Sequence, residues 1–126
     1  MRLEGDPPSP YEEEFGFSRV VRAGGFVLIG GTTSVGPCGS VIGESPYEQT
    51  IEILAKLVHE LERAGVGVAD VVQTRVFVTD ISRADEVGRA HGDVFGKYRP
   101  LMTMVEVSGL IDPRMLVEIE AVAYAG

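Results

Sequence analysis

The sequence predicts an α+β fold in which one sheet carries two helices on a single face. Three patterns indicate this: residues 117–121 alternate between apolar and acidic side chains, a capped amphipathic helix begins at Pro46, and residues 71–79 are rich in β-branched side chains. Because successive side chains of a strand point to opposite faces, Glu118 and Glu120 lie together. The two acids are then either solvated or held at a subunit interface, where a desolvated carboxylate is a candidate acid, base or ligand anchor.

The first part of the chain predicts a hairpin followed by a long loop. Residues 1–14 are expected to be an irregular lead-in. Residues 20–21 and 26–29 are apolar and flank Ala23-Gly24-Gly25, which is typical of a hairpin turn. A loop rich in glycine, threonine and serine is expected over residues 30–43.

The first helix has a clear beginning and end. Ser45 is a candidate N-cap before Pro46, and Glu48 stands three positions after Ser45, as in a capping box. Gly65 is expected to end the helix. Apolar side chains recur at helical spacing between these limits, at Ile51, Leu54, Leu57, Val58 and Leu61.

The second half predicts a strand, a helix and two further strands. Residues 71–79 form the first strand, and residues 80–82 lead into a helix that Pro100 stops, unless Pro100 begins the next strand. The apolar side of that helix comprises Val87, Ala90, Val94 and Phe95. Strands are expected over residues 102–108 and 116–124. The element order is β-β-α-β-α-β-β, with both helices on one face of the sheet.

Composition excludes several classes of protein. The 126 residues suffice for one domain, residues 1–126, with a core that needs neither disulfides nor metal. The net charge of −8, without a basic cluster, argues against nucleic acid as a partner. Cys38 is the only cysteine, and His59 and His91 lack a shared metal-binding spacing, so no metal site is expected. No signal peptide or membrane-length apolar run is present, so a cytoplasmic location is the default expectation.

The face of the sheet opposite the helices is expected to be covered by other copies of the chain. If the alternation holds, this face carries both methionines and acids, and it is too apolar to be simply solvated. A closed cyclic oligomer would cover it. The residues expected there are Thr74, Val76, Met102, Met104, Glu118 and Glu120.

The chain resembles the YjgF/RidA family, whose members are also described as L-PSP-type endoribonucleases. The resemblance implies a chorismate-mutase-like α+β fold and a homotrimer with its sheets packed inward and small-molecule clefts between subunits. It also implies hydrolysis of reactive enamines and imines to a 2-oxo acid and ammonia, without a cofactor. The residues that carry it, in order, are Gly30-Gly31-Thr32, Gln49-Thr50, Ala64-Gly65, Asp70-Val71-Val72, Val76 to Asp80, His91, Phe95, Pro100 and Val117 to Ala121.

The resemblance also implies roles for individual residues. Glu118 matches the acid that positions a water, and it is the candidate catalytic residue. Met102 stands where the deaminases have an arginine that clamps the substrate carboxylate, Phe17 where they have a tyrosine, and Gly30 where they have a serine. A guanidinium offers a carboxylate two hydrogen bonds and a thioether offers none. The chain therefore resembles an arginine-lacking branch of the family.

The candidate ligand-binding residues are Phe17, Arg19, Gly30, Gly31, Thr32, Arg75 and Met102. Arg19 could replace the missing cation or be a solvated strand residue. Arg75 could be a cation of the cleft or form an interface ion pair with a glutamate. His91 is expected to be a packing or helix-surface residue rather than a base, and nothing near Cys38 in sequence would activate its thiol.

Three classes of function follow. The first is a small cofactor-independent hydrolase or imine-handling enzyme that uses Glu118. The second is a trimer that binds or responds to a small metabolite without turnover. The third is a ribonuclease, which ranks last because the chain is acidic and offers no pair of histidines in an acid/base arrangement.

Overall fold

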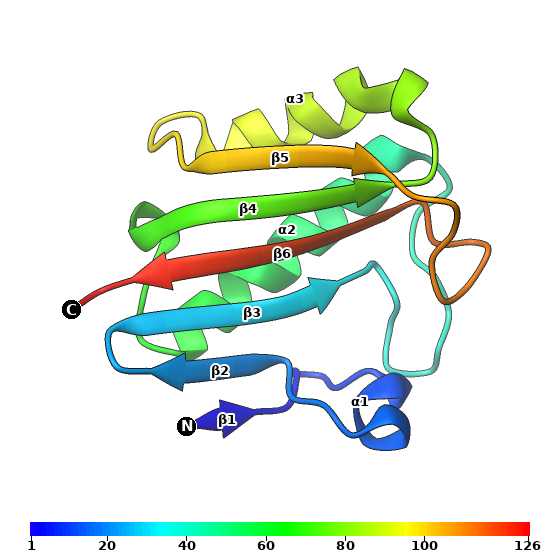
Figure 1. Ribbon diagram of the computed structural model, residues 1–126. Helices are drawn as coiled ribbons and strands as arrows, with labels where there is room; N and C mark the ends of the chain where they lie inside the picture. The colour runs from blue at the N-terminus through cyan, green and yellow to red at the C-terminus, as the bar shows by residue number, and fades with distance from the viewer.

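Strand β6 (Val117–Tyr124) lies inside a six-stranded sheet with the order β1-β2-β3-β6-β4-β5 (Figure 1). The computed structural model describes residues 1–126. Neighbouring strands are antiparallel except β4 and β5, which are parallel. The other strands are β1 (Arg2–Leu3), β2 (Val20–Ala23), β3 (Phe26–Thr32), β4 (Val71–Val78) and β5 (Leu101–Glu106).

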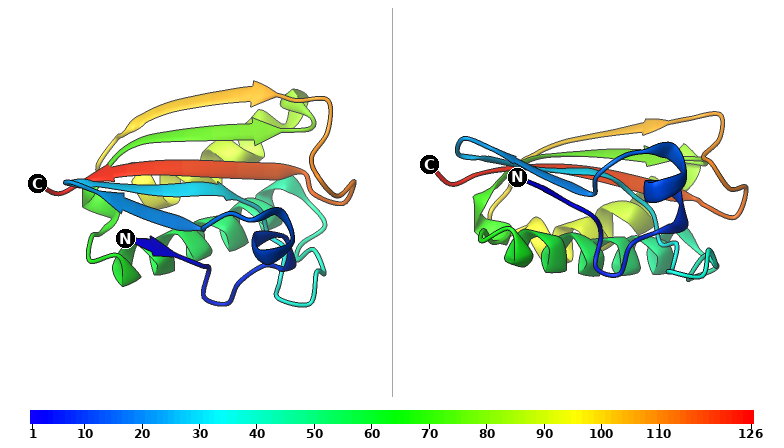
Figure 2. Two further views of the ribbon diagram at one scale, coloured as in Figure 1. Left: turned by 60° about the horizontal axis from the view of Figure 1, so that its bottom comes forward. Right: turned by 90° about the horizontal axis from the view of Figure 1, so that it is seen from below.

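Two long helices cover one face of the sheet and leave the other face open (Figure 2). They are α2 (Pro46–Arg63) and α3 (Ala84–Phe95), and short 3-10 turns at Val68–Asp70 and Ile81–Arg83 precede β4 and α3. The predicted cap of α2 is confirmed, because the Ser45 hydroxyl accepts a hydrogen bond from the Glu48 N–H at 3.1 Å. The predicted α+β class and the placement of both helices are also confirmed.

The prediction that residues 1–14 are irregular is wrong. Leu3 of β1 pairs with Val20 of β2, and helix α1 (Pro10–Phe15) follows. The signals for α1 are local. Ser9 precedes a proline at the first helical position, its N–H donates to the Glu12 carboxylate at 2.7 Å, and Gly16 ends the helix with a φ of 75°. As a result, α1 lies at the end of the sheet where β3 leads into the long loop (Figure 1).

The core forms between the helices and the face of the sheet that they cover. Val117, Ile119 and Ala121 of β6 are at most 2% exposed, as their alternation predicts. Helix α2 buries Leu54 and Leu57 against the sheet side of the core. Glu118 and Glu120 therefore lie on the open face.

The prediction that Thr74, Val76, Met102 and Met104 lie on the open face is wrong. Val76 is 1% exposed in the core, and the Thr74 hydroxyl lies 2.8 Å from His91 Nε2 on α3. Thr74 pairs with Met102 and Val76 with Met104, so all four residues lie on the helix side. A shift of one residue reverses the faces of a strand. The open face instead carries Phe26, Leu28, Gln73, Arg75, Phe77, Leu101, Thr103, Val105, Glu118, Glu120, Val122 and Tyr124.

The Thr74–His91 contact is expected to stabilise the packing of α3 on β4. Burial lowers the pKa of His91, so the ring is neutral and depends on Thr74 for a polar partner. We expect Thr74→Val to lower the free energy of unfolding by about 1–3 kcal/mol, because it leaves a buried ring nitrogen unpaired. Urea denaturation measures this change. The control is Ser108→Ala in the exposed segment after β5, expected to change stability by less than about 0.5 kcal/mol, and equal effects of both variants would contradict the assignment.

Candidate functional site

Glu118 occupies a place on the open face that only a glycine neighbour allows. It lies on β6 beside Gly31 of β3, and it is partly buried. A Cβ atom added at Gly31 would lie 2.5 Å from Glu118 Oε2 and 2.9 Å from its carboxyl carbon. Real Cβ atoms do not approach other atoms that closely. Gly31 has only a hydrogen at this position, so there is room for the Glu118 carboxyl group.

A small hollow lies in front of this carboxyl group. Its cavity volume of about 40 Å³ corresponds to a few water-sized positions. It brings together four residues predicted for the site, from β6, the end of β3 and the segment between α1 and β2: Phe17, Arg19, Gly31 and Glu118. Tyr11 of α1 and Met115 before β6 also line it. The sequence did not identify these two, and the Ser9-Pro10 helix start could have drawn attention to Tyr11.

The surroundings of Glu118 favour its protonated form. Burial raises the pKa of Glu118, and the nearby charge of Glu120 raises it further. Glu118 forms no ion pair within the chain. A carboxyl group of this kind can donate a proton and take it back closer to neutral pH than an ordinary glutamate.

Arg19 lines the hollow as a buried, neutralised cation. It is 4% exposed, which rules out a solvated strand residue, and its Nη2 donates to the Glu12 carboxylate at 2.8 Å. Burial acts to raise the pKa of Glu12, but N–H donors from Gly5 and Ser9 and the charge of Arg19 together lower it. Glu12 is therefore ionised, and it compensates the charge of Arg19. The Nε atom of Arg19 is buried and has no hydrogen-bond partner.

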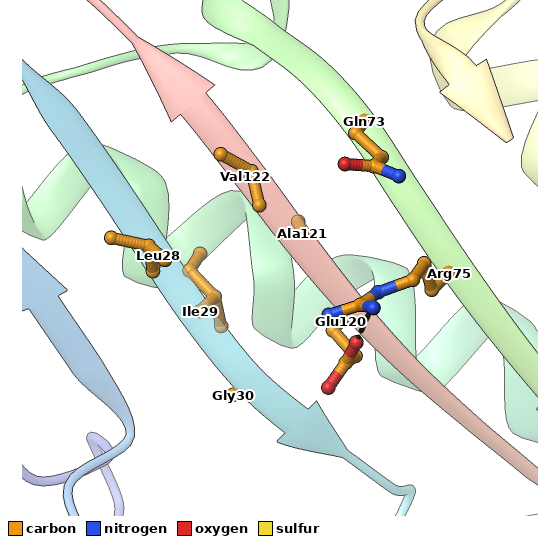
Figure 3. A pocket seen from close by; sticks show the side chains of 8 residues that line it. All are labelled: Leu28, Ile29, Gly30, Gln73, Arg75, Glu120, Ala121 and Val122. Atoms are coloured by element: carbon orange, nitrogen blue, oxygen red, sulfur yellow. Dashed lines mark ion pairs between the residues drawn. The ribbon is translucent and has the colours of Figure 1, made fainter.

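Arg75 belongs to a second hollow on the same face (Figure 3). Its Nε lies 2.6 Å from Glu120 Oε1 of the same chain, although this ion pair does not have the alignment of a hydrogen bond. In Figure 3 the Arg75 side chain extends from β4 to Glu120 on β6. Gly30 of β3 and Gln73 of β4 line the same hollow. The cavity volume is about 130 Å³. Arg75 therefore pairs with a glutamate of its own chain. Because it pairs with Glu120, it does not form an ion pair with Glu118.

Two predicted ligand-binding residues lie away from Glu118 within one chain. Met102 pairs with the buried Thr74, so it lies on the helix side of the edge strand β5. Thr32 is 1% exposed, and its hydroxyl donates to the Gly30 carbonyl at 2.8 Å. A single subunit therefore does not place either side chain at the Glu118 hollow.

The remaining candidates have structural places. His91 is buried against Thr74 and packs on Phe95, as the packing prediction has it. His59 lies 3.0 Å from Asp6, far along α2. No group of three histidine, cysteine, aspartate or glutamate side chains is arranged to hold a metal ion, and Cys38 is exposed. None of the helices combines the length and the apolar character that crossing a bilayer requires.

The contact of Gly31 with Glu118 predicts the effect of a single added methyl group. In Gly31→Ala the new Cβ displaces the flexible carboxyl group toward solvent, so we expect the pKa of Glu118 to fall toward the ordinary glutamate value. Carbon-13 NMR of the side-chain carboxyl measures this titration. Gly30→Ala is a matched control, because its Cβ would meet only carbonyl oxygens at 3.7 and 3.8 Å. An unchanged pKa in Gly31→Ala would contradict the described position of Glu118.

Known proteins resemble the chain over most of its length. The family described as Endoribonuclease L-PSP matches residues 10–125. The chain is 45% identical to the crystal structure of Rv2704 from Mycobacterium tuberculosis, a YjgF/YER057c/UK114 family member, with a TM-score of 0.89 over 99% of this chain and 98% of the other. It is 42% identical to SCO2049 of Streptomyces coelicolor over 94% and 88% of the two chains.

A more distant relative has the same extent. The RutC family protein PH0854 of Pyrococcus horikoshii is 32% identical over 86% of each chain. A shared fold does not by itself assign a reaction, which depends on the residues of the site. The sequence match and the shared fold agree, and the chain belongs to the YjgF/RidA family, the Endoribonuclease L-PSP family of the sequence match.

Proposed function

We propose that the Glu118 hollow binds small imines, enamines or related carbonyl compounds and hydrolyses the C=N bond, in a cytoplasmic homotrimer. The observation that carries the proposal is the Glu118 carboxyl group. It rests against Gly31, its pKa is raised by burial and by Glu120, and it faces a hollow with apolar walls.

Hydrolysis of an imine requires water to add to carbon and a proton to reach nitrogen. Glu118 takes both parts in this proposal: as a carboxylate it orients and deprotonates the water, and as an acid it returns the proton to the leaving amine. The C=N bond becomes C=O, and ammonia or an amine leaves, with no change of oxidation state. Phe17 and Met115 line the same hollow and supply part of its apolar wall.

The charges around the hollow favour a neutral substrate over a 2-imino acid. Arg19 is compensated by Glu12, Arg75 is paired with Glu120, and the residue at position 102 is a methionine. A substrate carboxylate would therefore meet no free guanidinium within the subunit. Low turnover of 2-iminopropanoate and 2-iminobutanoate is part of the proposal.

The open face of the sheet supports the proposed homotrimer. Exposed apolar side chains lie on three of its strands, including Phe26 and Leu28 on β3, Leu101 on β5 and Tyr124 on β6. Leu101 is 71% exposed in the single chain. An exposed apolar patch on a sheet face that no helix covers is typical of a subunit interface. In the trimer, a neighbouring subunit would enlarge the small Glu118 hollow into a ligand-binding cleft.

A second candidate function is binding of a small metabolite without turnover. It is favoured by the shortage of further polar groups, because Phe17 and Gly30 supply no hydroxyl group to assist Glu118. Cleavage of RNA has less support. The chain carries a net charge of −8, and its two histidines lie apart, one buried against Thr74 and one beside Asp6.

Glu118→Gln tests the proposal, with Glu120→Gln as the matched control. We expect Glu118→Gln to remove turnover of neutral imines, measured as released ammonia, and to leave folding intact. Burial of the charged form of Glu118 costs stability at neutral pH, so Glu118→Gln is expected to unfold at an equal or higher temperature. Glu120→Gln should weaken assembly, because it leaves Arg75 without its partner. At a concentration at which it remains a trimer, it should keep most of the turnover, because burial raises the pKa of Glu118 more than Glu120 does.

Light scattering and ligand-observed NMR complete the comparison. The account predicts a trimer mass for the wild type and for Glu118→Gln at micromolar concentration. Binding of imine analogues with no turnover in the wild type would favour the second candidate. If Glu118→Gln retains full turnover, or if its trimer dissociates while binding is unchanged, the proposed role of Glu118 is wrong.

A further inference from the structure

Lys56 of α2 is held beneath the long loop that follows β3. Its Nζ donates to the Thr33 carbonyl at 2.6 Å and to the Val35 carbonyl at 2.9 Å. A lysine amine has three positions for hydrogen besides its own carbon. Two are taken up by the loop carbonyls, and no protein group occupies the third, which holds a proton in the charged form and a lone pair in the neutral form.

Another hollow, which shares Arg19 and Val35 with the Glu118 hollow, is lined by Lys56. Its cavity volume is about 80 Å³, room for several water-sized positions. Pro7, Pro37 and Ile42 form apolar walls. Glu52 and Glu60 also line it, and Glu52 forms no ion pair within the chain. The site therefore combines one fixed amine, apolar walls, carboxylates and the Arg19 guanidinium.

Burial favours the neutral amine of Lys56. Burial lowers its pKa to about 8, and Arg19 contributes in the same direction, whereas Glu52, Glu12 and Glu60 oppose the shift. Asp6 is the other charged residue that lines the hollow. At pH 8 about half of the Lys56 side chains are then unprotonated, compared with less than about 1% of an ordinary lysine with a pKa near 10.4.

We propose that Lys56 is a second reactive site, which captures small aldehydes as a Schiff base. The Nζ lone pair forms a bond to the aldehyde carbon as the C=O π bond breaks, and a proton passes from the nitrogen to the oxygen to give a neutral carbinolamine. The C–O bond then breaks, the oxygen leaves as water with a proton from solvent, and a C=N bond remains. The step involves no oxidation or reduction, and water reverses it.

The surroundings fit the product of this step. The protonated Schiff base keeps the positive charge of the lysine, which Glu52 and Glu60 in the same hollow stabilise and Arg19 opposes. It has one N–H in place of several, so it retains only one of the two bonds to the loop carbonyls. Lys56 does not line the Glu118 hollow, so the capture of an aldehyde does not depend on the function proposed for Glu118.

The chain contains a built-in reference, because Lys97 is its only other lysine and is exposed. The experiment treats the folded protein with acetaldehyde and sodium cyanoborohydride, which reduces the Schiff base to a stable N-ethyl group. Peptide mass spectrometry then gives separate rates for Lys56, Lys97 and the α-amino group of Met1. We expect Lys56 to react about tenfold faster than Lys97 at pH 8, with a rate that rises between pH 6.5 and 8.5.

Two variants and one condition make the test decisive. Lys56→Arg keeps the charge and can still donate to the loop carbonyls, and it should remove the fast reaction, whereas Lys97→Arg should keep it. Unfolding in guanidinium chloride should make the two lysines equally reactive. Modification of Lys56 at or below the rate of Lys97 in the folded protein would overturn the proposal and leave Lys56 as a structural support of the loop.

Discussion

The alternation of strand β6 is the constraint on which the rest of the structure depends. Its apolar residues lie on α2 and the core, so its acids must lie on the opposite, open face. Glu118 cannot reach bulk water fully there, because Gly31 and the hollow beside α1 surround it. The same geometry thus forms the core and creates the partly desolvated carboxyl group.

This position of Glu118 lowers stability in return for reactivity. Its raised pKa means that the folded chain binds a proton more tightly than the unfolded chain. Its contribution to stability is therefore greatest at low pH, and is lost as the pH rises above the ordinary glutamate pKa of about 4.3 through the higher value of the folded state. A residue that the fold accommodates at a cost is more readily explained by function than by packing. Arg19 is different, because the ionised Glu12 pairs with it within the buried network.

The sequence predicted those elements whose patterns are local. The alternation of β6 was sufficient to predict that strand and its buried face. The Ser45 cap and the apolar spacing after it were sufficient to predict helix α2. The faces of β4 were not predictable in the same way, because residues 71–78 contain apolar side chains on both sides and the buried Thr74 is satisfied by His91, seventeen residues away in sequence. The Glu12–Arg19 pair was not predicted either. Its burial depends on helix α1, and residues 1–14 were expected to be irregular. Among the residues predicted for the site, Glu118, Gly31, Phe17 and Arg19 share one hollow. Gly30, Thr32, Arg75 and Met102 do not line it.

The titration of Glu118 in the wild-type protein tests the central claim most directly. Carbon-13 NMR of the glutamate side-chain carboxyls, assigned with Glu118→Gln, follows its ionisation as a function of pH. The account predicts a pKa above the ordinary value of about 4.3, because burial and Glu120 both disfavour the charged form. A pKa at or below that value would contradict the account, since it would mean that a cation or several hydrogen-bond donors stabilise the carboxylate, and that Glu118 is not available as a proton donor.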